Sequence, residues 1–391
     1  MGLLLAMAAT PLFKAADVPP NPRGDRLSTL DGLRGFLALG VFFCHASLYH
    51  EYIFKGRFGP PPGFYYHIGQ VGVEAFFLIT GYLFWSRLVA EKGRPDWLQL
   101  YIGRIFRIAP LYLLAILTMM VIIFVRRGFH LNVPLLVFVK QFIQWFSLGI
   151  LNTYDFNGYT ETWRLLVGVV WSLRFEWFFY FSLPLLALAA RSATMHLPIA
   201  AGALTIGLIY AAIYPPAYFP PVEILPALFL LGMTCGSLAR NRVIAPLTNP
   251  IASVICGMLI CGVFLASASE GDSYRAGAVV LLGGAFYLIA SGCSFFGVLT
   301  STPARRLGNV SYGIYLLQGL VLTLVFSVGW ASRLVLAGPL GYWCMVLVCA
   351  ALLVVVATLA HVGVERTGIE LGKRLGQAIR NSRIGAEPKS C

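Results

Sequence analysis

The feature that most constrains this chain is a series of apolar segments, each about twenty residues long, that recurs almost from end to end. The hydrocarbon core of a bilayer is about 30 Å thick, which a helix of about 20 apolar residues can span. Each such segment is therefore predicted to be a transmembrane helix. The ten segments cover about residues 29–50, 68–90, 108–125, 168–190, 195–214, 222–239, 250–268, 276–299, 309–330 and 338–362.

The composition supports the same fold class. Hydrophobic residues make up 58% of the chain and charged residues only 12%, whereas a soluble domain carries about 25% charged residues. We therefore predict an all-α polytopic membrane protein. The net charge of +13 does not require nucleic acid as a partner, because membrane proteins concentrate Lys and Arg on cytoplasmic segments. The eight cysteines show neither a disulfide framework nor metal-ligand spacing, so no metal site is expected.

The distribution of basic residues predicts the topology. An eleventh segment, about 134–151, is interrupted by Lys140, Gln141 and Gln144. The basic segments all fall on one side of the membrane only if this segment does not cross, as the excess of Lys and Arg on the cytoplasmic side requires. We therefore expect ten transmembrane helices, with residues 126–152 forming a re-entrant or interfacial segment on the outer face. Both termini are then cytoplasmic in a multi-pass protein of the inner (plasma) membrane.

Three parts follow along the chain. Residues 1–27 are predicted to be a flexible or interfacial cytoplasmic N-terminal arm, and residues 28–365 form one membrane domain. Residues 366–391 form a basic cytoplasmic tail, whose pattern is typical of an amphipathic helix along the inner membrane surface.

The first predicted span, LDGLRGFLALGVFFCHASLYH, carries a polar stripe. Asp31, Arg34 and His45 fall on one helical face, since the eleven residues from Arg34 to His45 return to within about 20° of the starting direction. A charge at mid-bilayer costs at least about 2.5–3.5 kcal/mol, so the stripe is expected to face a site. The alternative is that these groups only hold helices together, with Arg34 reaching the membrane surface.

Two carboxylates lie in later spans. Glu74, in the second span, is expected at a depth close to that of His45, where a carboxylate would fix the tautomer of the imidazole and raise its basicity. Glu176 lies in the segment WSLRFEWFFY, and an acid at that depth is a functional candidate. Arg174 is two residues away on the same helix and cannot face Glu176. Interfacial acids or ion pairs are the alternative for both carboxylates.

Basic and hydroxyl side chains complete the set of candidates. Arg104 and Arg107 lie one helical turn apart in YIGRIFRIAPLY, and paired guanidinium groups suit phosphate recognition. Such a pair at the cytoplasmic start of a helix can also be a topology anchor. The ninth span, in LGNVSYGIYLLQGLV, offers polar groups for substrate binding or for hydrogen bonds between helices. These are Tyr312, Tyr315 and Gln318.

Taken in order, these stretches resemble the acyltransferase 3 family of integral-membrane O-acyltransferases, from about Leu30 to Glu365. LDGLRGFLALGVFFCH resembles the family's Arg-x10-His signature, and RIFRIAPLY its Arg-x-x-Arg-x-x-Pro motif. GVEAFFLITGYLF resembles the second-helix motif, with Thr80 where Ser is usual. WSLRFEWFFY resembles the Trp-Ser-Leu-x-x-Glu motif. GNVSYGIYLLQ resembles the Ser-Tyr-x-x-Tyr-Leu-x-His element, with Gln318 at the usual His position, and VERTG replaces the more usual Val-Glu-Arg-Pro.

The resemblance implies transfer of an acyl group, commonly acetyl, from cytoplasmic acyl-CoA to a hydroxyl of a carbohydrate or glycolipid acceptor. No permanently bound cofactor is expected. Because the chain ends soon after the last span, the resemblance points to a stand-alone form without a fused extracytoplasmic hydrolase-like domain. The alternative function is a transporter or flippase for lipid-linked glycans or small anions, in which the intramembrane charges line a translocation path.

The resemblance and the helical geometry suggest the same division of roles. His45 lies about 16 Å further along its helix than Arg34, from eleven residues at about 1.5 Å each. His45 is expected to act as the general base, oriented by Glu74 or Glu176. The CoA end is assigned to Arg34, Arg104 and Arg107, together with Asp31. Tyr312, Tyr315 and Gln318 are assigned to the substrate.

Overall fold

The computed structural model describes residues 1–17, 27–59, 63–192, 194–214, 221–241, 249–270 and 275–386. Within these ranges the chain is helical, and the one β-type pairing is an isolated bridge between Phe156 and Tyr159. Seven described helices are long and apolar enough to cross a membrane, or eight if a pair bent by 66° counts as one span. The predicted all-α polytopic fold is confirmed.

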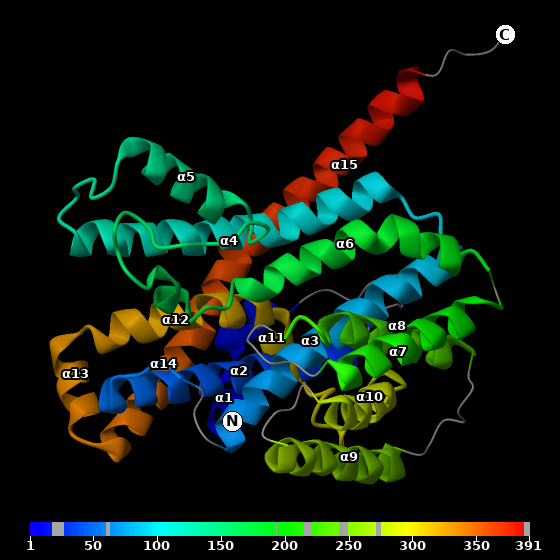
Figure 1. The fold of residues 1–391 in the computed structure, drawn as a ribbon, viewed down its shortest axis with the longest axis horizontal. Helices are drawn as coiled ribbons and strands as arrows, with labels where there is room; N and C mark the ends of the chain where they lie inside the picture. The colour runs from blue at the N-terminus through cyan, green and yellow to red at the C-terminus, as the bar shows by residue number, and fades with distance from the viewer. Residues whose placement is uncertain are drawn as a thin grey trace.

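Each predicted span contains a helix (Figure 1). Three of them, α8, α10 and α12, have only 17, 15 and 16 residues, which is short for a core of about 30 Å. The helices are α2 (Ser28–Lys55), α3 (Phe64–Ala90), α4 (Trp97–Arg126), α6 (Trp171–Ala190), α7 (His196–Ile213), α8 (Leu225–Asn241), α9 (Asn249–Glu270), α10 (Ala276–Ala290), α12 (Ser311–Phe326) and α14 (Pro339–Ala360). Shorter helices α11 (Thr302–Asn309) and α13 (Gly329–Leu336) flank α12.

The segment predicted not to cross contains helix α5 (Leu135–Phe146). Its 12 residues rise about 18 Å, too little to span the hydrocarbon core. The polar residues that interrupt the segment bind the loop that follows: the Gln141 Oε1 accepts a hydrogen bond of 2.9 Å from the Asn157 backbone N–H. The Trp145 indole donates another, of 3.0 Å, to the Tyr154 carbonyl. This loop leads through a short 3-10 helix, η2 (Thr162–Leu166), to α6.

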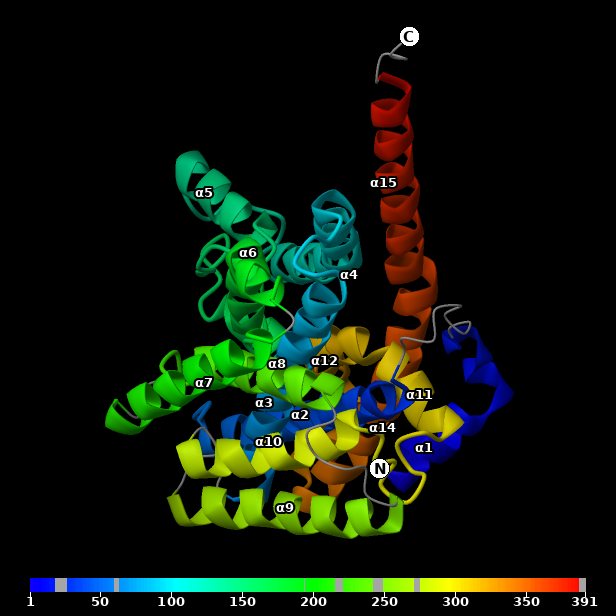
Figure 2. The ribbon, with the colours of Figure 1, turned by 90° about the vertical axis from the view of Figure 1, so that its right-hand side faces the viewer.

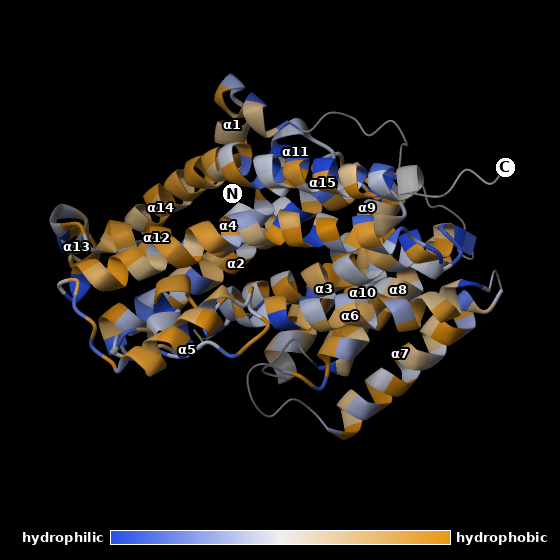
Figure 3. Cartoon of the chain, turned by 90° about the horizontal axis from the view of Figure 1, so that it is seen from above, coloured by the Kyte–Doolittle hydropathy of each residue, from blue (hydrophilic) through white to orange (hydrophobic). Residues whose placement is uncertain are grey.

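Backbone contact between α3 and α8 brings the second predicted span into the core. A Cβ at Gly81 would lie 2.2 Å from the Phe229 carbonyl oxygen, and one at Gly232 would lie 2.2 Å from the Leu78 carbonyl oxygen. Only glycine allows this approach, which is typical of helices packed in membranes. In Figures 1 and 2, α9 and α10 lie side by side at the edge of the molecule. Apolar residues dominate α12 and α14 (Figure 3).

The N-terminal arm is bound rather than loose over its described part. Helix α1 (Gly2–Ala9) and the 3-10 helix η1 (Pro11–Ala16) pack against α11. The Arg306 guanidinium donates hydrogen bonds of 2.8 and 3.0 Å to both carboxylate oxygens of Asp17. It also donates to the carbonyls of Ala8, Ala9 and Thr10. Residues 1–17 of the predicted flexible or interfacial arm are therefore packed on the protein, while residues 18–26 lie outside the described ranges.

The tail forms a helix, as predicted, and this helix packs against the protein. Helix α15 (Arg366–Ala386) continues α14 through one π-helical turn, η3 (His361–Glu365), and runs along α4 (Figure 2). A Cβ at Gly368 would lie 2.4 Å from the Pro110 ring, so the two helices touch closely. The position of α15 along a membrane surface stays a prediction, and residues 387–391 lie outside the described ranges.

Candidate active site

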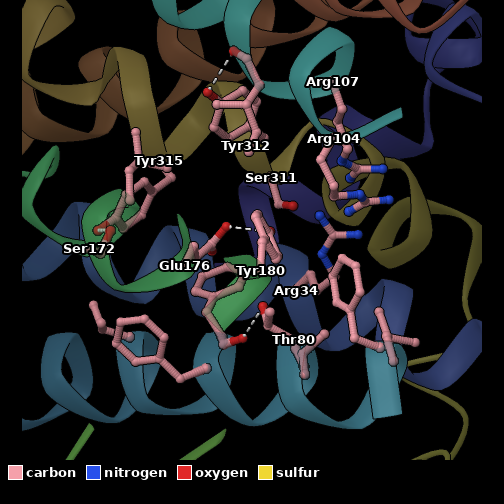
Figure 4. A pocket seen from close by; sticks show the side chains of 18 residues that line it. Arg34, Thr80, Arg104, Arg107, Ser172, Glu176, Tyr180, Ser311, Tyr312 and Tyr315 are labelled. Carbon is pink, nitrogen blue, oxygen red and sulfur yellow. Dashed lines mark hydrogen bonds between the residues drawn. The ribbon is translucent and has the colours of Figure 1, made fainter. Parts of the chain in front are cut away.

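A cavity of about 190 Å³ lies between α2, α3, α4, α6 and α12, and is called the arginine cavity below. Three arginines and one glutamate supply its charges, and tyrosine and serine hydroxyls supply its other polar groups (Figure 4). Its polar lining residues are Arg34, Thr80, Arg104, Arg107, Ser172, Glu176, Tyr180, Ser311, Tyr312 and Tyr315. Polar groups from the first, second, third, fourth and ninth predicted spans therefore meet here.

The three arginines gather on one side of this cavity (Figure 4). Arg34 comes from α2, whereas Arg104 and Arg107 come from one turn of α4. The Arg104 guanidinium lies over the Phe84 ring, 4.9 Å from its centroid, a cation–π contact that holds it in place. Arg34 feels repulsion from the other two arginines and attraction from Asp31 and Glu365. Converging guanidinium groups of this kind form a site for an anion such as a phosphate.

Glu176 faces the arginines from α6. The Tyr180 hydroxyl, one turn further along α6, donates a hydrogen bond of 2.8 Å to the Glu176 Oε2. The Tyr180 carbonyl in turn accepts a bond of 2.9 Å from the Tyr101 hydroxyl. The Ser311 side chain is 1% exposed, and its hydroxyl has no hydrogen-bond partner among the described residues. An unpaired buried hydroxyl is costly, so Ser311 is available to a bound ligand.

The far end of the arginine cavity is formed by hydroxyls already bound to the protein. The Tyr315 hydroxyl shares a hydrogen bond of 2.9 Å with the Ser172 hydroxyl and lies 3.3 Å from the Val169 carbonyl. The Tyr312 hydroxyl donates to the Ile108 carbonyl at 3.0 Å. Both tyrosines therefore join helices as well as line the cavity, so the interpretation as hydrogen bonds between helices is confirmed and substrate binding stays a prediction.

A second cavity, of about 690 Å³, contains the His45 side chain and is called the histidine cavity below. It lies among α2, α6, and the loops around residues 58–66 and 145–170. Aromatic rings dominate its lining, with Arg174, Asn152 and Thr153 as polar neighbours of His45. The aromatic residues are Phe58, Tyr66, Trp145, Trp163, Trp171 and Phe175.

The first two turns of α6 separate the cavities. Ser172 and Glu176 line the arginine cavity, whereas Trp171, Arg174 and Phe175 line the histidine cavity. This division follows from the helix itself, because residues two apart point in different directions. Arg174 and Glu176 therefore serve different sites, as the sequence predicted.

The His45 ring has an open hydrogen-bonding position within the described part of the chain. The His45 Nδ1 is buried and has no hydrogen-bond partner among the described residues. Gln318, on α12, is the polar neighbour of the His45 side chain; its Oε1 has no hydrogen-bond partner among the described residues, and its Nε2 donates to the Tyr315 carbonyl at 2.7 Å. Gln318 thus links His45 to a residue of the arginine cavity.

The structure brings only part of the predicted set together. Six of the ten residues line the arginine cavity: Arg34, Arg104, Arg107, Glu176, Tyr312 and Tyr315. His45 lines the histidine cavity instead. Glu74 and Gln318 are fully buried and line neither cavity. Asp31 attracts Arg34 electrostatically but does not line the arginine cavity. Arg34 and His45 share a face of α2 but open into different cavities.

Four polar residues that line the arginine cavity were not among the site residues assigned from the sequence, namely Thr80, Ser172, Tyr180 and Ser311. Tyr180 is four residues after Glu176, a spacing that places both on one helical face and that could have identified it. Ser172 and Ser311 lie inside motifs already noted. Glu365 could not be identified from a local pattern. It is 1% exposed and accepts a hydrogen bond of 2.9 Å from the His361 Nδ1. It attracts Arg34 electrostatically only because η3 packs against α4. In the described part of the chain no three His, Cys, Asp or Glu side chains are grouped as a metal site.

Comparisons with known proteins agree with this architecture. A family model described as an acyltransferase domain, Acyl_transf_3, matches residues 27–361. The chain is 28% identical over 320 residues to YrhL of Bacillus subtilis, whose provisional name is peptidoglycan O-acetyltransferase. That match covers 73% of this chain and 47% of YrhL, so the chain spans about half the length of this relative.

Two further relatives match different amounts of the chain. The exopolysaccharide production protein ExoZ of Rhizobium meliloti is 28% identical over 288 residues, which are 70% of this chain and 82% of ExoZ. The acyltransferase MdmB of Streptomyces mycarofaciens is 35% identical over 104 residues, which are 26% of each chain. No solved structure matches the chain.

Proposed function

Because the chain belongs to the acyltransferase 3 family of multi-pass membrane acyltransferases, we propose that it moves an acyl group, in the first instance acetyl, from acyl-CoA to a hydroxyl of a carbohydrate or glycolipid acceptor. The observation that carries this proposal is the cluster of Arg34, Arg104 and Arg107 in one cavity, beside a second cavity that contains His45. The names of two relatives, which refer to peptidoglycan and to exopolysaccharide, support a carbohydrate acceptor.

The arginine cavity would bind the phosphate-bearing end of acyl-CoA. Three guanidinium groups exceed the charge of Glu176 there, and each can form paired hydrogen bonds to phosphate oxygens. Ser311 adds a donor that has no other partner among the described residues. Glu176, held by Tyr180, would limit how far the phosphates enter by repelling them. Asp31 would hold Arg34 in position from outside the cavity.

The acyl group would then reach His45 past the first turn of α6. Ser172 and Tyr315 close the arginine cavity at the point where Trp171 and Val170 begin to line the histidine cavity. The distance from Arg34 to His45 along α2, about 16 Å, is one that an extended acyl-pantetheine arm can cover. Tyr315 and Gln318 lie along this route, so we assign them to the passage of the donor.

The reaction itself would be a direct transfer. His45 takes the proton of an acceptor hydroxyl while the hydroxyl oxygen forms a bond to the thioester carbonyl carbon. The carbon–sulfur bond then breaks, and the CoA thiolate takes up the proton from His45, so the products are an O-acyl ester and CoA. Gln318 would fix the orientation of the imidazole. Glu74, fully buried on the neighbouring helix α3, is assigned a supporting electrostatic role.

The proposed arrangement in the cell follows from the donor. Acyl-CoA is cytoplasmic, so the arginine cavity would face the cytoplasm and the histidine cavity the outer side of the inner membrane. Residues 28–365 would form the catalytic membrane domain, with the arm at 1–27 and the tail at 366–391 on the cytoplasmic side.

The test is release of CoA by the purified chain in lipid nanodiscs. We expect acetyl-CoA to be consumed and its acyl group to appear on added oligosaccharide. Arg34→Gln, Arg104→Gln or Arg107→Gln should each weaken donor binding at least about tenfold, since a charged hydrogen bond contributes about 1.5–3 kcal/mol. Arg87→Gln is the matched control, because Arg87 is an exposed residue at the end of α3 that pairs with Glu91. A wild-type protein that neither binds acetyl-CoA nor releases CoA would refute the proposal.

A further inference from the structure

The histidine cavity contains a positive charge that the proposed reaction does not use. Arg174 is the one side chain with a full formal charge among the described residues that line this cavity. Its Nε is buried and has no hydrogen-bond partner in the described part of the chain. Arg174 as a whole is only partly buried, but an unpaired buried N–H is costly, and such a group is retained where something else supplies the partner.

The neighbouring acidic residues are already engaged elsewhere. Glu176 lies on the other face of α6, where it accepts the hydrogen bond from Tyr180. Glu161, in the loop before η2, forms an ion pair with Arg164. The Asp155 carboxylate accepts from the Thr162 backbone N–H at 3.3 Å. Within the described ranges, no acidic side chain therefore pairs with Arg174 in the cavity that His45 shares.

The other residues that line the histidine cavity indicate which kind of molecule would carry the anion. Trp163, Trp171 and Phe175 present flat apolar faces, on which the C–H face of a sugar ring can pack. Asn152 and Thr153 add neutral hydrogen-bonding groups. A volume of about 690 Å³ is within the range of pockets that enclose a small ligand.

We infer that Arg174 selects an anionic acceptor, namely a sugar that carries a carboxylate or a phosphate close to the hydroxyl that is acylated. The inference rests on the proposed function, because an acceptor needs to enter the cavity in order to reach His45. It goes beyond that function because it names the charge of the acceptor and the residue that binds this charge. Arg174 would bind two oxygens of the anion at once and so fix the sugar ring against the aromatic faces.

Binding measured without acyl donor tests this inference separately from catalysis. The full chain in nanodiscs of neutral lipid is titrated with a neutral oligosaccharide, with its uronic acid counterpart, and with the corresponding sugar phosphate. Quenching of tryptophan fluorescence reports occupancy, since three tryptophans line the cavity. We expect the wild type to bind at least one of the anionic ligands about tenfold or more tightly than the neutral one. Which of the two it prefers identifies the anion.

Three variants make the result specific. Arg174→Gln should bind all three ligands with equal affinity, and Arg174→Lys should keep part of the preference. Lys140→Gln, which removes the same charge from an exposed position on α5, should behave as wild type. Equal binding of neutral and anionic sugars by the wild type, or a preference that survives in Arg174→Gln with unchanged thermal stability, would overturn the inference.

Acyl transfer to a neutral acceptor at an undiminished rate would overturn it too, while leaving the proposed function intact. Anion-selective binding without any acyl transfer would support the role of Arg174 in binding and would refute the proposed function.

Discussion

The Tyr180 hydroxyl donates a hydrogen bond of 2.8 Å to the Glu176 carboxylate across one turn of α6. This bond fixes the only carboxylate among the described lining residues of the arginine cavity, opposite three guanidinium groups. The position of negative charge in the cavity therefore depends on a residue four places further along the same helix.

Tyr180→Phe removes this bond and keeps the ring in place. A hydrogen bond to a charged group contributes about 1.5–3 kcal/mol, so we expect kcat/KM for acyl transfer to fall by about tenfold or more. Glu176→Gln should lower it further. The control is Tyr101→Phe, which loses a hydrogen bond of 2.9 Å to the Tyr180 carbonyl outside the cavity. If Tyr101→Phe and Tyr180→Phe lose activity equally, α6 stability rather than Glu176 is responsible.

His45→Ala and His45→Gln should both lose transfer activity, because neither side chain accepts the proton of the acceptor hydroxyl. General-base assistance contributes about 10²–10⁴-fold to the rate, and kcat is expected to fall by that amount while acetyl-CoA affinity stays unchanged. His50→Gln is the control on the same helix, since His50 packs on Phe54 and Tyr342 and lines neither cavity. A folded His45→Ala protein that keeps more than a few per cent of the normal rate would contradict the mechanism.

Acid should release the N-terminal arm. The hydrogen bonds from Arg306 lower the pKa of the Asp17 carboxyl below its usual 3.8. A carboxyl whose pKa is lower in the bound state stabilises that state above the usual pKa, and the effect is lost as the pH falls through the lowered value. A spin label at Leu12→Cys, with the exposed Cys261 and Cys344 and the C-terminal Cys391 replaced by serine, should therefore be immobile at pH 7 and mobile well below pH 4.

The variant Asp17→Asn should make the same label mobile already at pH 7. Asp96→Asn is the matched control, because Asp96 pairs with Arg380 on α15 and does not contact the arm. Label mobility that is the same in Asp17→Asn and in the unmodified background at pH 7 would mean that the ion pair does not hold the arm.

Gly81→Ala should destabilise the helix bundle. The added Cβ would lie 2.2 Å from the Phe229 carbonyl oxygen, so α3 and α8 would have to separate. Overpacking of this kind costs about 1–3 kcal/mol, which would appear as a lower Tm in detergent. Gly103→Ala on α4 is the comparison, because its Cβ meets no atom within 4 Å and alanine is a better helix former than glycine. Equal Tm values for the two variants would show that α3 and α8 are not in backbone contact.

The sequence by itself determined the fold class and the helices. A bilayer requires long apolar segments whose backbone groups are satisfied internally, so every predicted span could be recognised from local composition and contains a helix. Relations within one helix were equally predictable, since the helical repeat alone puts Arg104 and Arg107 one turn apart and separates Arg174 from Glu176. The polar residues Lys140, Gln141 and Gln144 likewise set the segment at about 134–151 apart from the predicted spans, and its helix α5 has only 12 residues.

Only the tertiary structure decided how these helices divide the site. Arg34 and His45 share a stripe on α2, yet different helices and loops pack against the two ends of that stripe. The two side chains therefore line separate cavities. Glu365 approaches Arg34, and Arg306 binds Asp17, across almost the whole chain. Helical periodicity acts over a few residues, whereas the choice of packing partner depends on close backbone contacts such as that of Gly81 with Phe229. Those contacts form only when distant segments meet, and no local pattern encodes them.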